Sequence, residues 1–154
     1  MSPPTQLGEV VHGNHEYDGR IIIYILQGRH HSSALRPSID GWVADQTNYI
    51  NYIKPLILAE ELKVAHVLSI IDTKDEWYYS IHPERYVPAL RDKDPKTKQD
   101  IVVFESTACL EYLAERFDGE GLWAGRTAWE KATVMSWTAY ETAGLGYDTS
   151  RDPK

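Results

Sequence analysis

The pattern of hydrophobic and polar residues predicts short buried strands that alternate with amphipathic helices. The apolar run Ile21–Leu26 has the length and the β-branched content of a buried strand. A helical pattern follows from about Asn51 to Lys63, and Pro55 is expected near the first turn of that helix. The other expected elements are a strand at Val67–Ile71, a short helix at Glu76–His82, strands at Val87–Leu90 and Ile101–Phe104, and a helix with Ser106 as its N-cap. This order predicts an α/β fold with a mixed four-stranded sheet and flanking helices.

Three segments fall outside this alternation. Residues 1–19 are rich in proline, glycine and polar residues, which predicts a flexible N-terminal segment. The polar stretch 27–46 is too long for an ordinary connection, so we interpret it as an insertion in a domain that spans residues 20–118. Residues 119–154 begin as a linker and continue as a helix with an apolar stripe, which predicts the start of an all-helical unit.

Composition narrows the possible partners. The chain has 154 residues and a formal net charge of −7, which disfavours a nucleic-acid partner, since binding to the phosphate backbone requires clustered Lys and Arg. No apolar run approaches the ~20 residues of a membrane helix, and the first residues lack the features of a secretory signal. The single cysteine, Cys109, permits no internal disulfide, and no metal-type spacing occurs. We therefore expect a cytoplasmic protein without a metal and without a membrane partner.

The segment Val87-Pro88-Ala89-Leu90 carries the first candidate chemistry. Proline cannot donate to a strand ladder and is usually confined to edges and strand starts. If the Val87–Pro88 bond is cis, the backbone amide and carbonyl of Val87 can face an extended ligand. An ordinary trans-proline turn is the alternative.

Glu105 and Ser106 carry the second candidate chemistry, which is the binding of charged groups. Ser106 is a candidate N-cap for a helix whose apolar residues recur at helical spacing, namely Leu110, Leu113, Ala114 and Phe117. Its amide and hydroxyl are suited to a ligand carboxylate at the positive end of the helix, and Glu105 is suited to an ammonium group. A simple capped helix is the alternative. A ligand that satisfies both sites is γ-glutamyl-cysteinyl-glycine, which is glutathione.

With these motifs in this order, residues 47–146 resemble the glutathione transferase superfamily, and in particular its fungal members, including the nitrogen-regulation branch. The resemblance implies a thioredoxin-like N-terminal domain, followed by the beginning of an all-helical domain that is truncated in this chain. It also implies that glutathione is a co-substrate bound by Val87, Pro88, Glu105 and Ser106.

The family places a hydrogen-bond donor for the glutathione thiol between the first strand and the first helix. Such a donor favours the thiolate, whose unperturbed pKa of about 8.5 is otherwise too high for chemistry at neutral pH. Aligning Lys54 and Glu60–Leu62 with the family's first helix makes Asn51 the expected catalytic residue, with Tyr49 and Tyr52 as neighbouring hydroxyls. The alternative is that Asn51 merely caps this helix.

The expected function is conjugation of glutathione to a small electrophile, in detoxification or in the tailoring of a fungal secondary metabolite. The alternatives are a non-catalytic binding or regulatory module and a truncated, inactive fragment. The family resemblance also suggests a homodimer. His66 and His82 are expected to be isolated residues.

Overall fold

The computed structural model describes residues 8–26 and 46–145. The expected insertion therefore lies outside the described residues, apart from Gln46. The elements are β1 (Glu9–His12), β2 (Ile21–Leu26), α1 (Gln46–Glu61), β3 (His66–Ile71), the 3₁₀ helix η1 (Glu76–Ser80), β4 (Ala89–Lys93), β5 (Asp100–Phe104), α2 (Ser106–Phe117), α3 (Ala128–Tyr140) and the π-helix η2 (Glu141–Leu145).

The strands form one mixed sheet in the order β1-β3-β2-β4-β5. β3 runs parallel to β1 and β2, whereas β4 is antiparallel to both β2 and β5. The sheet therefore has five strands where the sequence predicts four. The additional strand, β1, lies within residues 1–19, which the sequence predicts to be a flexible segment. It pairs with the edge of β3, with Glu9 opposite Val67. The side chains of β1 are mostly exposed, so its sequence carries little hydrophobic pattern from which a strand could be predicted.

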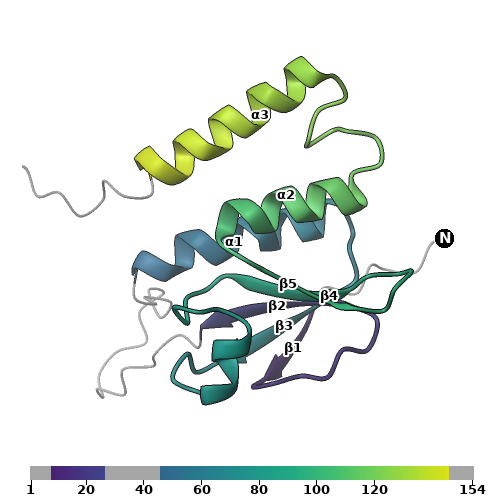
Figure 1. The fold of residues 1–154 in the computed structure, drawn as a ribbon. Helices are drawn as coiled ribbons and strands as arrows, with labels where there is room; N and C mark the ends of the chain where they lie inside the picture. The colour runs from purple at the N-terminus through teal and green to yellow at the C-terminus, as the bar shows by residue number, and fades with distance from the viewer. Residues whose placement is uncertain (1–7, 27–45, 146–154) are drawn as a thin grey trace, which may run out of the picture.

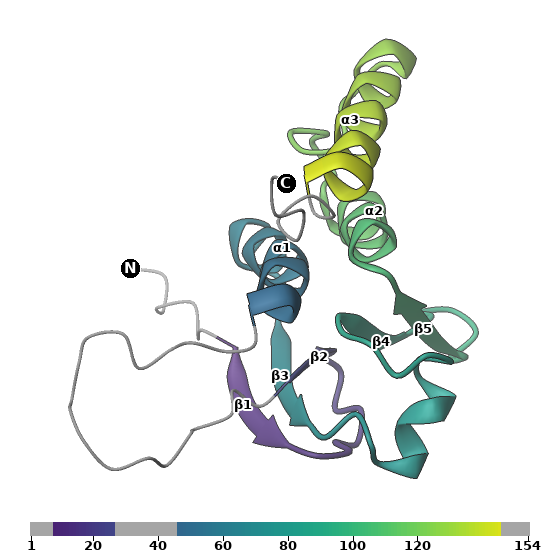
Figure 2. The same ribbon diagram turned by 90° about the vertical axis from the view of Figure 1, so that its left-hand side faces the viewer.

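The central strand β2 is buried on both faces, which explains its unbroken apolar sequence. Ile21 and Ile23 face the core beneath α1 and α2, and Ile22 and Tyr24 face a second core beside η1. Figures 1 and 2 show α1 and α2 side by side on one face of the sheet, with α3 stacked on their outer side.

Two helix starts differ from expectation. α1 begins at Gln46, so Pro55 lies inside the helix and not in its first turn. Because proline has no N–H, the carbonyl of Asn51, four residues earlier, lacks its helical partner. α2 begins at Ser106 with Glu105 as the N-cap, one residue earlier than predicted.

A buried carboxylate holds three segments together. Asp92 of β4 is 1% exposed and accepts hydrogen bonds from the hydroxyls of Tyr17 and Tyr112, both at 2.8 Å. Arg116 of α2 completes the group, with its Nε 3.1 Å from the same carboxylate. The network joins the chain before β2 to β4 and to the last turn of α2.

Replacing Asp92 by alanine is expected to lower the free energy of unfolding by about 3 kcal/mol, because the Arg116 charge and two tyrosine hydroxyls lose their acceptor. Equilibrium denaturation measures this change. Asp100→Ala is the control, since Asp100 is 50% exposed and pairs with Arg91 at the surface; it should cost no more than about 1 kcal/mol. Equal losses in the two variants would contradict the role given to Asp92.

Candidate functional site

Val87 lies where the chain enters β4, and its peptide bond to Pro88 is cis, which confirms the predicted isomer. The Val87 side chain is buried, with 4% of the residue exposed. Within the part of the chain that the structure describes, its backbone N–H and C=O form no hydrogen bond, because ladder pairing of β4 starts at Ala89. An unpaired amide and carbonyl next to a sheet can bind an extended peptide.

Glu105 connects β5 to α2. Its φ of 74° lies in the left-handed region, which residues with a side chain seldom adopt. Its carbonyl accepts the Cys109 amide at 2.9 Å, while its side chain is 69% exposed. Such backbone values persist where the surrounding structure enforces them and often mark functional positions.

Ser106 is the first residue of α2 and is buried, with 4% of the residue exposed. Its hydroxyl forms no hydrogen bond to the residues that the structure describes. The first amides of a helix have no partner within the helix and lie at the positive end of its dipole. This end of α2 can therefore bind an anionic group.

The pairing of β4 with β5 brings these two sites together. Ala89 is opposite Phe104 in the antiparallel ladder, so the chain before Ala89 and the chain after Phe104 leave the sheet at the same end. The unpaired backbone of Val87 thus lies at the same end of the sheet as Glu105 and Ser106. We call Val87, Pro88, Glu105 and Ser106 together the clamp.

His82 is a neighbour of the clamp that sequence reasoning missed. The sequence suggested an isolated histidine, but the structure places its Nε2 3.9 Å from Oε1 of Glu105. Desolvation lowers the pKa of His82 below its usual value, against the opposing charges of Glu105 and Glu84. The contact joins distant segments of the chain, so no local spacing could have revealed it.

Asn51 lies in the second turn of α1 and is half-buried. It is therefore neither in the connection between the first strand and the first helix, where the resemblance placed the donor, nor the N-cap residue that the alternative interpretation required. The adjacent Tyr52 packs against the core cluster that contains Val87. Tyr52 is thus the residue of this turn that reaches the core cluster beside η1.

The end of α3 is attached near the clamp by two polar contacts. Lys54 of α1 donates to Glu141 at 3.1 Å, and the hydroxyls of Thr107 and Thr142 are 2.6 Å apart. Because Thr107 follows Ser106 directly, the second contact places the turn after α3 beside the first turn of α2.

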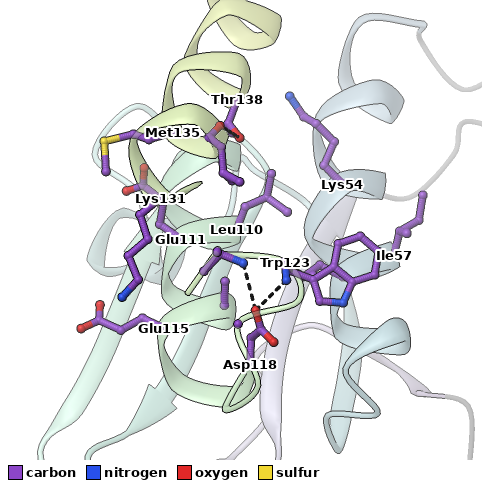
Figure 3. Close-up of a pocket in the computed structure, with 16 residues that line it drawn as sticks. Lys54, Ile57, Leu110, Glu111, Glu115, Asp118, Trp123, Lys131, Met135 and Thr138 are labelled. Carbon is purple, nitrogen blue, oxygen red and sulfur yellow. Dashed lines mark hydrogen bonds between the residues drawn. The ribbon is translucent and has the colours of Figure 1, made fainter. Parts of the chain in front are cut away.

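A cleft of about 670 Å³ separates α3 from α1 and α2. Figure 3 shows Ile57 and Trp123 on one side of it and Met135 and Lys131 on the other. Its walls are mainly apolar and contain no clamp residue. At one end of the cleft, the carboxylate of Asp118 holds the segment between α2 and α3. It accepts hydrogen bonds from the backbone amides of Trp123 at 2.7 Å and Ala124 at 2.9 Å (Figure 3).

Cys109 lies behind the clamp but is not a nucleophile. It is fully buried, and burial, assisted by the charge of Glu105, raises the pKa of its thiol to about 12. Residues 8–26 and 46–145 contain no cluster of His, Cys, Asp or Glu suited to a metal ion. Within the same ranges, no helix is both long enough and apolar enough to cross a bilayer.

This chain is similar to known proteins of one family. Residues 52–116 match the family model of the glutathione S-transferase N-terminal domain. Glutathione S-transferase aclG of Aspergillus oryzae is 60% identical over 131 residues, which are 85% of this chain and 52% of that protein. Trimodular acetylaranotin synthesis protein ataIMG of Aspergillus terreus is 68% identical over 106 residues, which are 69% of this chain and 12% of that protein. The chain thus spans about half the length of aclG.

A solved structure has the same fold. It is a glutathione transferase family member from Pseudomonas fluorescens with two glutathione bound, and it aligns with a TM-score of 0.63 at 20% identity. The alignment covers 86% of this chain and 50% of that one. Together with the family model, it confirms the predicted thioredoxin-like fold class.

Lys54→Met is expected to loosen the attachment of α3, because it removes the charge that holds Glu141 but keeps most of the side-chain stem. Amide hydrogen exchange in Ala128–Tyr140 should become several-fold faster, in line with an interaction of roughly 1 kcal/mol. Lys96→Met, in the exposed β4–β5 turn, is the control. Unchanged exchange in α3 would mean that the Lys54–Glu141 contact does not hold the helix.

Proposed function

Since this chain carries the N-terminal domain of the glutathione S-transferase superfamily, we propose that it binds glutathione at the clamp and presents the glutathione thiolate to a small electrophile. The observation that carries the proposal is the common location of an unpaired peptide backbone and an anion-binding helix end. Glutathione has a peptide backbone in its middle, and its γ-glutamyl end bears both an ammonium and a carboxylate.

Each clamp residue has a distinct role in this proposal. The backbone N–H and C=O of Val87, held beside Pro88, pair with the cysteinyl unit as an added strand would. Ser106 binds the γ-glutamyl carboxylate through its hydroxyl and the first amides of α2. Glu105 binds the ammonium group, and its exposed side chain is free to do so.

Asn51 is the proposed donor to the sulfur. A hydrogen bond to the thiolate stabilises the charged form and lowers the pKa of the thiol. The remaining rate enhancement comes from holding the thiolate close to the electrophile, with no covalent enzyme intermediate. The adjacent Tyr52 packs against the cluster that contains Val87, so its hydroxyl is the second candidate donor.

The names of the relatives suggest a physiological setting. One relative is a glutathione S-transferase and another is a protein of acetylaranotin synthesis, both from Aspergillus. On this basis we assign the protein to the tailoring of a fungal secondary metabolite, with detoxification as the related role.

The proposal also covers the organisation of the chain. The glutathione-binding domain, predicted at residues 20–118, also takes in β1, because this strand pairs with β3 in the same sheet. Residues 119–154 are proposed as a linker and the start of a helical domain. The protein would act in the cytoplasm as a homodimer. The homodimer is what the family resemblance implies. The side chains of Trp129 and Trp137 on α3 are 75% and 67% exposed, and further helices of the helical domain would cover this face.

Glu105→Gln and Ser106→Ala should each weaken the binding of S-hexylglutathione about tenfold or more. The first removes the negative charge that faces the ligand's ammonium group, and the second removes the hydroxyl that binds its carboxylate. Isothermal titration calorimetry measures the change. Glutamine keeps a Cβ at position 105, so the unusual backbone conformation is equally costly before and after the substitution. Glu115→Gln, an exposed carboxylate near the other end of α2, is the matched control.

The outcomes separate the alternatives. A folded wild-type protein that binds no S-hexylglutathione would overturn the proposal. Binding without turnover of a model aryl halide would favour the non-catalytic module over the transferase.

Asn51→Ala should lower kcat/KM for a model aryl halide and glutathione by about tenfold to a hundredfold while S-hexylglutathione binds as before, because only the thiolate loses a donor. Tyr52→Phe is the matched comparison, since it removes the neighbouring hydroxyl and keeps the ring. A loss confined to Tyr52→Phe would transfer the donor role to Tyr52.

A further inference from the structure

We propose that His82 is a positioning residue, whose imidazole donates its Nε2–H toward the Glu105 carboxylate and orients that carboxylate for the ammonium group of the ligand. The inference rests on the proposed glutathione site and adds a residue to it. Neither the family model nor the resemblance of the motifs assigns a role to this histidine.

The hydrogen bonds of His82 determine which nitrogen carries the proton. Nδ1 accepts the backbone N–H of Glu84 at 3.1 Å. A nitrogen that accepts a hydrogen bond is unprotonated, so the neutral ring carries its proton on Nε2. Nε2 is the atom that faces Glu105, at 3.9 Å from Oε1.

The ring is held rigidly in this orientation. Only 3% of the His82 side chain is exposed. Its ring centroid is 4.8 Å from that of Phe104, the residue before Glu105, and 5.7 Å from that of Tyr86, the residue before Val87. His82 therefore lies between the two halves of the clamp and contacts a neighbour of each.

The distance to Glu105 has a functional meaning. At 3.9 Å the two groups attract each other electrostatically but do not form a full hydrogen bond, for which about 3 Å is needed. Polar contacts of this kind often shorten when the ligand binds. A neutral donor behind Glu105 restrains the carboxylate without cancelling the negative charge that the ammonium group needs.

Protonation of His82 would partly cancel the negative charge of Glu105 that the ligand's ammonium group needs. The charged groups that face the ring are Glu105, at the β5–α2 junction, and Glu84, on its own segment; Tyr86 adds a neutral hydroxyl. Because burial lowers the pKa of His82, the neutral ring is favoured at pH 7 and the charged ring forms as the pH falls. The imidazolium would then pair with Glu105 and repel the ligand's ammonium.

The test is the Kd of S-hexylglutathione between pH 5 and pH 8, measured on the whole chain by calorimetry. This ligand has no free thiol to titrate in that range. For the wild type, Kd should rise about three- to tenfold as the pH falls through the titration of His82. His82→Gln, which keeps an N–H donor but cannot gain a proton, should bind with nearly wild-type affinity at pH 7 and lose the pH-dependent step. His82→Leu, which has no donor, should bind about three- to tenfold more weakly at pH 7.

His66→Asn is the matched control. His66 is also a buried histidine with Nε2 near a carboxylate, 3.3 Å from Glu60, but it lies in β3, away from the clamp. Its replacement should leave both the affinity and the pH-dependent step unchanged. A step that persists in His82→Gln, or wild-type affinity in His82→Leu, would overturn the role of His82.

A measurement without ligand tests the coupling itself. Glu105→Gln should lower the pKa of His82 in an NMR titration of the imidazole, because the carboxylate that favours the charged ring is gone, whereas Glu115→Gln should not. This result tests the contact between His82 and Glu105 even if His82→Leu fails to fold, and His82→Gln then tests its effect on the ligand. Absence of S-hexylglutathione binding at every pH would count against the proposed function, whereas binding that ignores His82 would overturn only this inference.

Discussion

The antiparallel pairing of β4 with β5 is the constraint on which the candidate site depends. It places Ala89 opposite Phe104, and so carries the Val87 backbone and the start of α2 to one end of the sheet. Neither half is sufficient alone, because an unpaired amide gives no charge recognition and a helix end gives no strand-like pairing. β4 is held in turn by β2, which is buried on both faces of the sheet.

Polar contacts lie at both ends of α2, and they differ in burial and in length. At its last turn, Arg116 meets the carboxylate of Asp92, which also accepts Tyr17 and Tyr112. At its first turn, Glu105 faces the imidazole of His82. The first contact is fully satisfied and contributes stability. The second is longer, and it leaves the exposed carboxylate able to respond to a ligand or to a proton.

The third helix extends the structure away from the sheet. Its start is fixed by a capping box of Thr127 and Glu130, and its end is attached to Lys54 and Thr107 beside the clamp. No residue of α3 is buried within the described residues, and an apolar cleft separates it from α1 and α2. The same helix therefore contributes both to the surroundings of the clamp and to a face with large exposed side chains.

The sequence alone determined the strands and helices whose apolar residues recur with a clear period, because burial imposes that period locally. Ile21–Leu26 and the helix at Ser106 are examples, and the strings around Pro88 and Glu105 indicated the ligand chemistry. The sequence did not reveal β1, which is stabilised mainly by backbone pairing with β3 and needs no hydrophobic pattern. Nor did it reveal the first turn of α1, because Pro55 suggested a helix start near Asn51, whereas the helix begins at Gln46. Only the tertiary structure decided that His82 faces Glu105 and that Asp92 joins three segments, since these contacts arise from sheet pairing between residues far apart in the chain.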